Sequence, residues 1–167
     1  MKMLVHKKID SAFKRIKLLI FMLKSNLVTN RKLVLKKYDT GWGDVNVIFN
    51  CVIPLNLLMV EIHGYGYIPI KDSPHFKFAQ FLLGDKQGQS EPYINYITEH
   101  YPSEDLDKTI SNFKTTLRFA LDKPESVDIL VTAIKKSDYI FTIIDGVHRT
   151  AIIAALNRPK IRCFFRF

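Results

Sequence analysis

The segment from residue 137 to residue 157 constrains the fold most, because a buried-strand pattern turns through one glycine into a short helix. Residues 137–144 are apolar, aromatic and β-branched, which is typical of a buried strand. Residues 150–156 are rich in alanine and lead into Asn157-Arg158-Pro159, which predicts a short helix that ends there. The pentapeptide Asp-Gly-Val-His-Arg at 145–149 joins the two elements.

This pentapeptide has the composition of a phosphate-binding turn. The first N–H groups of a helix have no partner within the helix, and the helix dipole is positive at that end, so both favour a phosphate. Gly146 lets the backbone approach a ligand closely, and Arg149 can bind two phosphate oxygens at once. An ordinary strand-to-helix turn with a surface arginine would have the same spacing, so the pentapeptide alone leaves both interpretations open.

Length and composition indicate one globular domain. The chain has 167 residues and is 47% hydrophobic, which suffices for a core and excludes a disordered chain. Cys51 and Cys163 are far apart and lie in apolar runs, without the spacing of a zinc site or a disulfide framework. We therefore predict reduced thiols in a cytoplasmic protein.

The formal charge of +9 is concentrated at the N-terminus. Residues 1–37 hold eleven lysines and arginines and one acidic residue, Asp10, whereas the rest of the chain holds 14 basic and 15 acidic residues. We predict a basic amphipathic arm over residues 1–37 and a near-neutral domain over residues 38–167. A near-neutral body argues against a protein that coats nucleic acid with its whole surface.

The arm is predicted to be an amphipathic helix. Apolar residues recur along it at helical spacing, at Ile9, Ala12, Phe13, Ile16, Leu19, Ile20, Leu23 and Leu27. Its most apolar run, residues 18–23, is far shorter than the roughly 20 residues that span a bilayer. Three interpretations stand: a helix packed on the domain, an interfacial helix on the anionic inner membrane face, and a nucleic-acid contact.

The remaining elements predict an α+β fold. Residues 38–44 look like a turn-rich boundary between arm and body. Strands are expected over 45–53, 127–135, 139–144 and 160–167. Helices are expected over 76–83 and over 103–121, the second with Ser103 as its N-cap.

Residues 143–151, Ile-Ile-Asp-Gly-Val-His-Arg-Thr-Ala, resemble the signature of the ParB/sulfiredoxin-like superfamily. Upstream, residues 52–58 look like the segment with which these domains begin, and residues 68–70 look like their short central strand. The resemblance covers roughly residues 45–167, with a helical insertion at about 72–125. It implies a mixed sheet with packed helices, in which the turn after a strand binds nucleotide phosphates.

Single residues separate the branches of this superfamily. Sulfiredoxin needs a reactive cysteine inside the turn, and Val147 stands at that position. Chromosome-partition members carry a helix-turn-helix region after the motif, whereas the residues that follow Arg149 predict only one helix and one strand. The branch that remains includes free-serine kinases, and chains of this general look also resemble proteins encoded among bacterial surface-polysaccharide genes. The resemblance therefore implies phosphoryl transfer to a small hydroxylated metabolite.

The resemblance also implies a nucleotide site at the turn. Its members are Asp145, Gly146, His148, Arg149 and Thr150, which would hold the phosphates of ATP or ADP, and for Thr150 a role as helix cap is the alternative. Asp145 would in addition help to bind Mg²⁺ together with the nucleotide oxygens.

Catalytic and substrate residues are expected upstream of the insertion. Glu61 is the first candidate for the base that accepts the hydroxyl proton, and nearby His63 is the second. Lys71 and Asp72 follow the segment 68–70 and are candidates to face the substrate. A solvated carboxylate and an ordinary loop histidine are the alternatives for Glu61 and His63.

Two other functions fit the same residues. One is a non-enzymatic adaptor that responds to a nucleotide and is held at the membrane by the basic arm. The other is a nucleic-acid-binding protein of ParB type, with the arm supplying phosphate contacts whose affinity would fall with salt. The near-neutral body places nucleic acid last.

Overall fold

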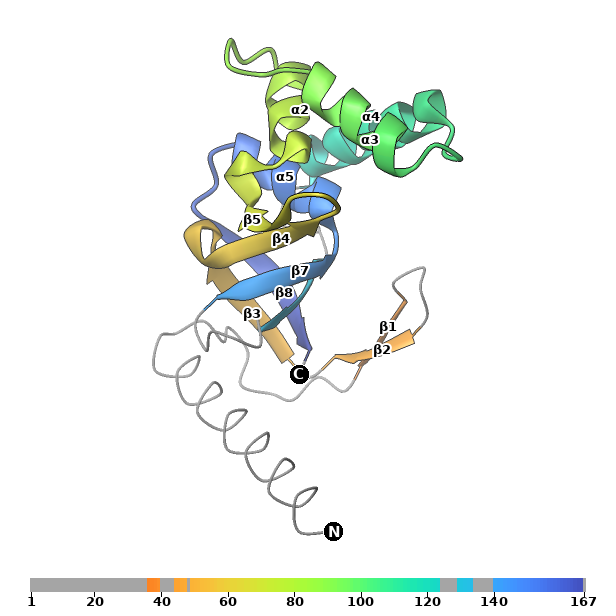
Figure 1. The fold of residues 1–167 in the computed structure, drawn as a ribbon. Helices are drawn as coiled ribbons and strands as arrows, with labels where there is room; N and C mark the ends of the chain where they lie inside the picture. The colour runs from red at the N-terminus through yellow and green to blue at the C-terminus, as the bar shows by residue number, and fades with distance from the viewer. Residues whose placement is uncertain (1–35, 40–43, 48, 124–128, 134–139, 167) are drawn as a thin grey trace.

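The described strands form two sheets, and the larger one positions the site (Figure 1). The computed structural model describes residues 36–39, 44–47, 49–123, 129–133 and 140–166. Its strands are β1 Lys36–Asp39, β2 Asp44–Val47, β3 Phe49–Pro54, β4 Leu58–Ile62, β5 Gly66–Pro69, β6 Leu130–Ala133, β7 Phe141–Asp145 and β8 Lys160–Arg166. β1 and β2 form an antiparallel pair by themselves, and the other six strands form one mixed sheet.

The six-stranded sheet has the order β3-β8-β6-β7-β4-β5. Three neighbouring pairs are antiparallel, whereas β6 with β8 and β4 with β7 are parallel. Leu58 on β4 pairs with Phe141 on β7, and Val60 pairs with Ile143. Because the two strands are parallel, their carboxyl ends meet at the same edge of the sheet, where open mixed sheets commonly bind ligands.

Four α-helices and two short 3-10 helices are described. They are η1 Leu55–Leu57, η2 Ile70–Asp72, α2 Pro74–Leu82, α3 Glu91–His100, α4 Leu106–Asp122 and α5 Val147–Ala155. α5 packs against both α2 and α4, and the group of α2, α3 and α4 lies above the sheet in Figure 1. Residues 150–154 of α5 are all buried, which is the pattern of a helix enclosed on every side. The α+β class predicted from the sequence is confirmed.

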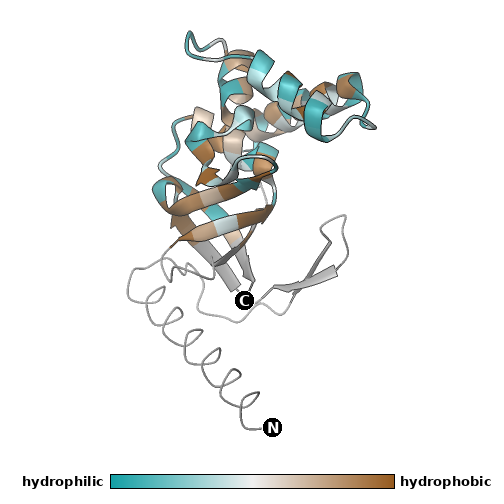
Figure 2. Ribbon diagram, viewed as in Figure 1, coloured by the Kyte–Doolittle hydropathy of each residue, from teal (hydrophilic) through white to brown (hydrophobic). Residues whose placement is uncertain are grey.

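Buried and more exposed side chains alternate along β4, which shows which face of the sheet packs against the helices. Leu58, Val60 and Ile62 of β4 are buried, whereas Glu61 between them is exposed. Successive side chains of a strand point to opposite faces, so Glu61 faces away from the core. In Figure 2 the strands β4 and β7 are mostly brown, which fits their central place in the sheet.

Local capping explains where two of the helices begin. The Ser73 hydroxyl accepts a hydrogen bond from the Phe76 N–H at 3.2 Å, and Pro74 occupies the first turn of α2. The Asp105 carboxylate accepts from the Lys108 N–H at 3.1 Å at the start of α4. The prediction of Ser103 as the N-cap of this helix is therefore wrong, because the carboxylate of Asp105 supplies the cap.

Several predicted boundaries need correction. Residues 38, 39 and 44 of the segment expected to be a turn-rich boundary belong to β1 and β2, and residues 45–53 divide between β2 and β3. α3 was missing from the prediction, and α5 begins at Val147, before the predicted 150. The predicted helical segment at about 72–125 contains α2, α3 and α4.

Most of the predicted arm lies outside the described residues. Lys36 and Lys37 are its only described members, and both belong to β1. The predicted domain boundary between residues 37 and 38 therefore falls inside a strand and is wrong at that point. Within the described ranges, no helix has the length and the apolar character needed to cross a membrane.

Candidate functional site

The predicted phosphate-binding turn is the start of α5. Gly146 is the N-cap of this helix and has φ 93° and ψ 30°, a left-handed conformation that glycine adopts without steric cost. The Gly146 carbonyl accepts hydrogen bonds from the Thr150 N–H at 2.8 Å and from the Thr150 hydroxyl at 2.9 Å. Thr150 is fully buried. Its hydroxyl therefore secures the first turn of the helix, which is the alternative role expected for it from the sequence.

An ion pair holds the charged side chains of the turn. Arg149 Nη2 lies 2.8 Å from Asp145 Oδ2, one helical turn away. The two side chains are 29% and 25% exposed, so the pair lies at the surface and is partly sheltered. The carboxylate therefore helps to fix the direction of the guanidinium, a group whose planar fork of N–H donors suits phosphate oxygens.

The His148 side chain points away from solvent and toward helices α3 and α4. Its Nε2 lies 2.9 Å from the Tyr93 hydroxyl, and its ring centroid is 4.8 Å from that of Phe113. Burial, reinforced by the charge of Arg149, lowers the pKa of His148 to about 4. His148 is therefore neutral near pH 7 and is not the cationic phosphate ligand that the sequence suggested.

A second buried histidine, His75, lies next to His148. His75, in the first turn of α2, is 6% exposed, and its ring centroid lies 5.1 Å from that of His148. Burial lowers its pKa well below the usual value, and the neighbouring His148 adds to the effect. Among the described residues, none is a hydrogen-bond partner of His75 Nδ1. No local sequence pattern indicates this pairing, because α2 and α5 are far apart along the chain.

The parallel pairing of β4 with β7 brings the predicted bases to the edge where the turn lies. Continuing the register from Val60 and Ile143 sets Ile62 beside Asp145. Glu61 reaches the same edge on the outer face of the sheet, where it hydrogen-bonds the Tyr67 hydroxyl and raises the pKa of Tyr67. Its side chain is thus on the face opposite to α5.

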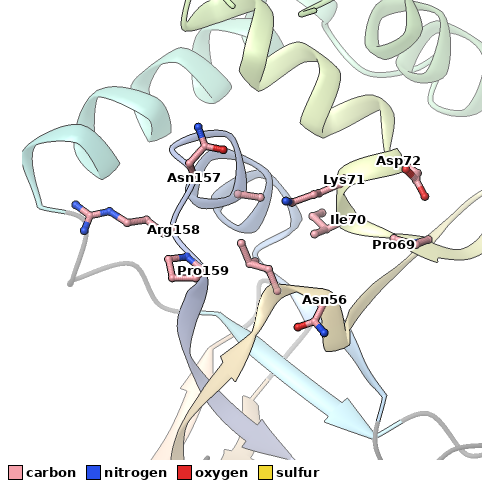
Figure 3. Close-up of a pocket in the computed structure, with 10 residues that line it drawn as sticks. Asn56, Pro69, Ile70, Lys71, Asp72, Asn157, Arg158 and Pro159 are labelled. Atoms are coloured by element: carbon pink, nitrogen blue, oxygen red, sulfur yellow. The ribbon is translucent and has the colours of Figure 1, made fainter.

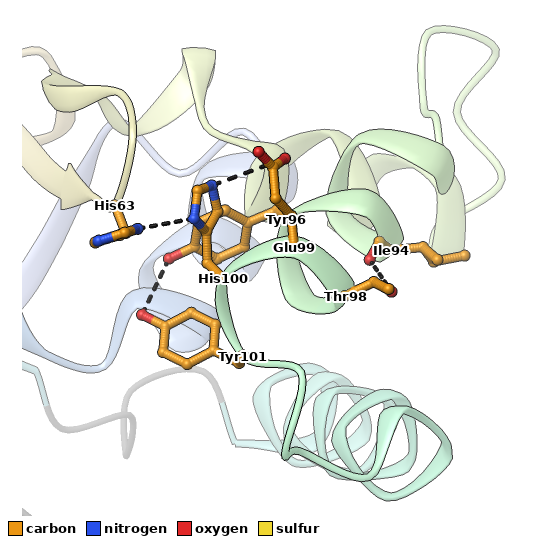
Figure 4. Close-up of polar contacts among 7 residues, drawn as sticks. All are labelled: His63, Ile94, Tyr96, Thr98, Glu99, His100 and Tyr101. Atoms are coloured by element: carbon orange, nitrogen blue, oxygen red, sulfur yellow. Dashed lines mark hydrogen bonds and ion pairs between the residues drawn. The ribbon is translucent and has the colours of Figure 1, made fainter.

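His63, one residue beyond β4, turns toward the helices instead. Its Nδ1 lies 2.7 Å from Nδ1 of His100, at the end of α3, and Figure 4 shows the two rings meeting. Glu99 Oε2 lies 3.9 Å from the other nitrogen of His100, Nε2. His63 is exposed, whereas the His100 side chain is only 13% exposed. A surface histidine is therefore backed by a sheltered one and by a carboxylate.

The turn before β5 is shaped for this contact. Gly64 has φ 80°, and a Cβ atom placed on it would lie 3.1 Å from the His100 ring. Glycine therefore serves two purposes here, since it permits the left-handed backbone and leaves room for the imidazole. His100 was not among the predicted site residues, because its helix, α3, was not predicted either.

Lys71 and Asp72 lie in a different place from the other predicted residues. They belong to η2 and line a cavity of about 590 Å³ together with Ala154 and Asn157, at the carboxyl end of α5 (Figure 3). α5 has nine residues, so its two ends are separated by about 13 Å at 1.5 Å per residue. Phosphoryl transfer needs reacting atoms within about 3.5 Å. Lys71 and Asp72 therefore lie too far from the turn to touch the reacting atoms there, and their contact with a substrate stays a prediction.

One carboxylate at the turn is available to a metal ion. Mg²⁺ that arrives with a nucleotide is bound mainly by phosphate oxygens and water, with one or two protein carboxylates. The ion pair with Arg149 engages Oδ2 of Asp145, so the residue fits this part through its other oxygen. In the described part of the chain, no group of three or more His, Cys, Asp or Glu residues could hold a metal ion by itself.

We compared the chain with models of protein families, with curated proteins and with solved structures, and none of them matches it. The resemblance to the ParB/sulfiredoxin-like superfamily therefore rests on the residues of the turn and on the order of the elements around it.

Proposed function

We propose that this protein binds a nucleotide at the start of α5 and transfers its terminal phosphoryl group to a small hydroxylated metabolite. The observation that carries the proposal is the left-handed Gly146 followed by the first turn of α5, with Arg149 oriented by Asp145. This turn lies at the carboxyl edge of the parallel strands β4 and β7, and His63 directly follows β4 at the same edge. The ParB/sulfiredoxin-like fold, with ATP or ADP and Mg²⁺ as its ligands, is part of the same proposal.

Each group of the turn has a different part in binding the phosphates. Backbone N–H groups of the first turn of α5 point toward the phosphate oxygens, and the Arg149 guanidinium neutralises their charge. Asp145 keeps Arg149 in place and contributes an oxygen to Mg²⁺, which would neutralise the charge that develops on the transferred group. His148 anchors the turn to α3 through Tyr93.

Geometry favours His63 over Glu61 as the base. One arrangement of protons suits the whole chain of groups: His63 Nδ1–H donates to His100 Nδ1, and His100 Nε2–H faces Glu99. His63 Nε2 then has a lone pair for the hydroxyl proton of the metabolite. The hydroxyl oxygen forms a bond to the terminal phosphorus, the bond from phosphorus to the bridging oxygen breaks, and the shortened nucleotide leaves.

Titration calorimetry of ATP, ADP and CTP with Mg²⁺ tests the binding step. Arg149→Ala should weaken binding about 100-fold, because it removes two charge-assisted hydrogen bonds worth roughly 3 kcal/mol together. Arg118→Ala removes an exposed arginine of α4 and should leave the affinity unchanged, which makes it the matched control. If none of the three nucleotides binds the wild-type chain, the proposal fails.

A turnover assay then separates the two candidate bases. His63→Gln should retain nucleotide binding and lower turnover by about 100-fold or more. Glu61→Gln, on the outer face of the sheet, should turn over at the wild-type rate. The opposite pattern would assign the base to Glu61, and nucleotide binding without turnover in the wild type would identify a nucleotide-responsive adaptor.

A role for the basic arm completes the proposal. We place the arm, residues 1–37, on an anionic membrane surface, where its cluster of lysines and arginines attracts acidic lipids. Such a location fits the synthesis of surface polysaccharides, whose precursors carry many hydroxyl groups. Deletion of residues 1–30 should abolish sedimentation with anionic liposomes, and unchanged sedimentation would remove the arm from the proposal.

A further inference from the structure

The cavity at the carboxyl end of α5 is built by three separate segments. η1 contributes Leu55, η2 contributes Ile70 and Lys71, and the residues after α5 contribute Asn157 and Arg158. Its volume of about 590 Å³ is within the range of roughly 300–1,000 Å³ that is typical of small-molecule sites. The Leu55 N–H donates to the Pro159 carbonyl at 3.2 Å, so two of the three walls are tied together.

The end of α5 offers few free acceptors to this cavity. The Arg158 N–H donates to the Ile153 carbonyl at 3.3 Å, and the Asn157 N–H donates to the Ala154 carbonyl at 3.0 Å. Asn157 has φ 56°, and these two bonds form the left-handed cap that closes many helices. Two of the carbonyls at the end of the helix are thus already paired with backbone donors and do not face a ligand as free acceptors.

Lys71 supplies the charge of the cavity. Figure 3 shows its amino group pointing into the space between Ile70 and Asn157, whereas the Asp72 carboxylate points away. Within the described residues, neither Lys71 nor Arg158 has an ion-pair or hydrogen-bond partner for its side chain. Arg158 extends outward from the rim, and its long stem lets the guanidinium swing over a bound anion. One cation inside and one at the rim outweigh the Asp72 carboxylate and the helix dipole together, because the C-terminal charge of the dipole is only about half an elementary charge.

From this arrangement we infer a second ligand site, distinct from the nucleotide turn, for a small oxyanion-bearing metabolite. Lys71 binds the phosphate or carboxylate group, and Arg158 closes over it from the rim. The apolar floor of Leu55, Ile70 and Ala154, all of them buried, accommodates the carbon chain. The site lies at the other end of α5 from Arg149, so its ligand binds independently of the nucleotide.

The test uses the full ¹⁵N-labelled chain and three small probes. Glycerol 3-phosphate and succinate carry the two oxyanions, and glycerol is the uncharged control. Binding of either oxyanion should shift the amide resonances of Asn56, Lys71 and Asn157, and the relative affinities tell phosphate from carboxylate. Lys71→Gln should weaken binding at least tenfold, and Arg158→Gln should weaken it less, because Arg158 lies at the rim.

Matched variants separate this site from the nucleotide turn. Lys114→Gln removes an exposed lysine of α4 and should leave the affinity unchanged, and Arg149→Ala should do so as well. Lys71 and Arg158 are exposed, so their variants should melt at the wild-type temperature. Resonance shifts confined to residues 145–149, or no shifts with either oxyanion at 10 mM, would overturn the inference without affecting the proposal for the turn.

Discussion

The two ends of α5 use their charged groups in opposite ways. At the amino end, Arg149 is paired with Asp145 at 2.8 Å, and His148 is hydrogen-bonded to Tyr93. At the carboxyl end, Lys71 points into a cavity and finds no partner among the described residues. The same helix thus carries a turn whose polar side chains are already engaged and a cavity whose cation is available.

This difference bears on how each end can bind a ligand. A phosphate at the amino end must share Arg149 with Asp145, so binding there depends on an arginine that is already oriented and loses little freedom. An anion at the carboxyl end displaces no protein partner of Lys71, but it must order a flexible side chain. We therefore expect stricter geometric selection at the turn and looser selection at the cavity.

The largest effect that would sharpen the comparison is the pH dependence of stability. The pKa of His148 is about 4 in the native protein and about 6.5 in the unfolded chain. Between these values the unfolded state holds more protons, so stability is complete above pH 6.5 and is lost as the pH falls toward 4. We expect a loss of roughly 3 kcal/mol from His148, and buried His75 adds in the same direction. Urea unfolding at several pH values measures it.

Two variants distinguish the titration of His148 from its packing as the source of this pH dependence. His148→Gln removes a titrating group and should flatten the pH dependence. Tyr93→Phe removes only the hydrogen bond to His148, so it should lower stability by about 1 kcal/mol at every pH and keep the slope. Equal slopes in all three proteins would show that His148 is not the group responsible. The carboxyl end of α5 has no such histidine and should not contribute to the pH dependence of stability.

The sequence predicted the amino end of α5 better than the carboxyl end, for a physical reason. The strand 141–145, the glycine and the helix follow one another along the chain, so local patterns sufficed to place Gly146 and Arg149 at a helix start. The cavity joins residues 55, 71 and 158, whose proximity depends on how the sheet brings distant segments together. Local patterns therefore could not show that Lys71 lies at the other end of α5 from the turn.

The contacts of the site residues with helices α3 and α4 could not be predicted for a related reason. The family resemblance implied that His148 is a phosphate ligand, whereas its contacts with Tyr93 and Phe113 come from helices far along the chain. The missing prediction of α3 also hid His100, the partner of His63. The α+β class survived these errors because it depends on the number and order of elements, whereas a site depends on which side chains meet.

An intermediate effect is expected in the turn that holds His63. Gly64→Ala forces alanine to φ 80° and places its Cβ 3.1 Å from the His100 ring, so the ring must move. We expect a loss of roughly 2 kcal/mol from backbone strain and from the weakened imidazole pair, and a fall in turnover of about tenfold. Gly66→Ala is the matched control, because its φ is 70° with nothing within 4 Å. The control should lose about 1 kcal/mol and retain turnover, and equal turnover in both variants would separate His100 from the chemistry.

The smallest effect lies at the carboxyl end of α5 and separates folding from binding there. Asn157 adopts φ 56° and lines the cavity. Asn157→Gly should raise stability by about 0.5 kcal/mol, because glycine adopts this conformation most easily, whereas Asn157→Ala should lower it by about 1 kcal/mol. Both variants remove the same side-chain amide, so both should weaken glycerol 3-phosphate binding equally, by roughly threefold for one neutral hydrogen bond. If affinity instead followed stability, with the glycine variant binding more tightly than the alanine variant, the amide would have no part in the site. The cavity would then depend on the helix cap, as the turn at the other end depends on its glycine.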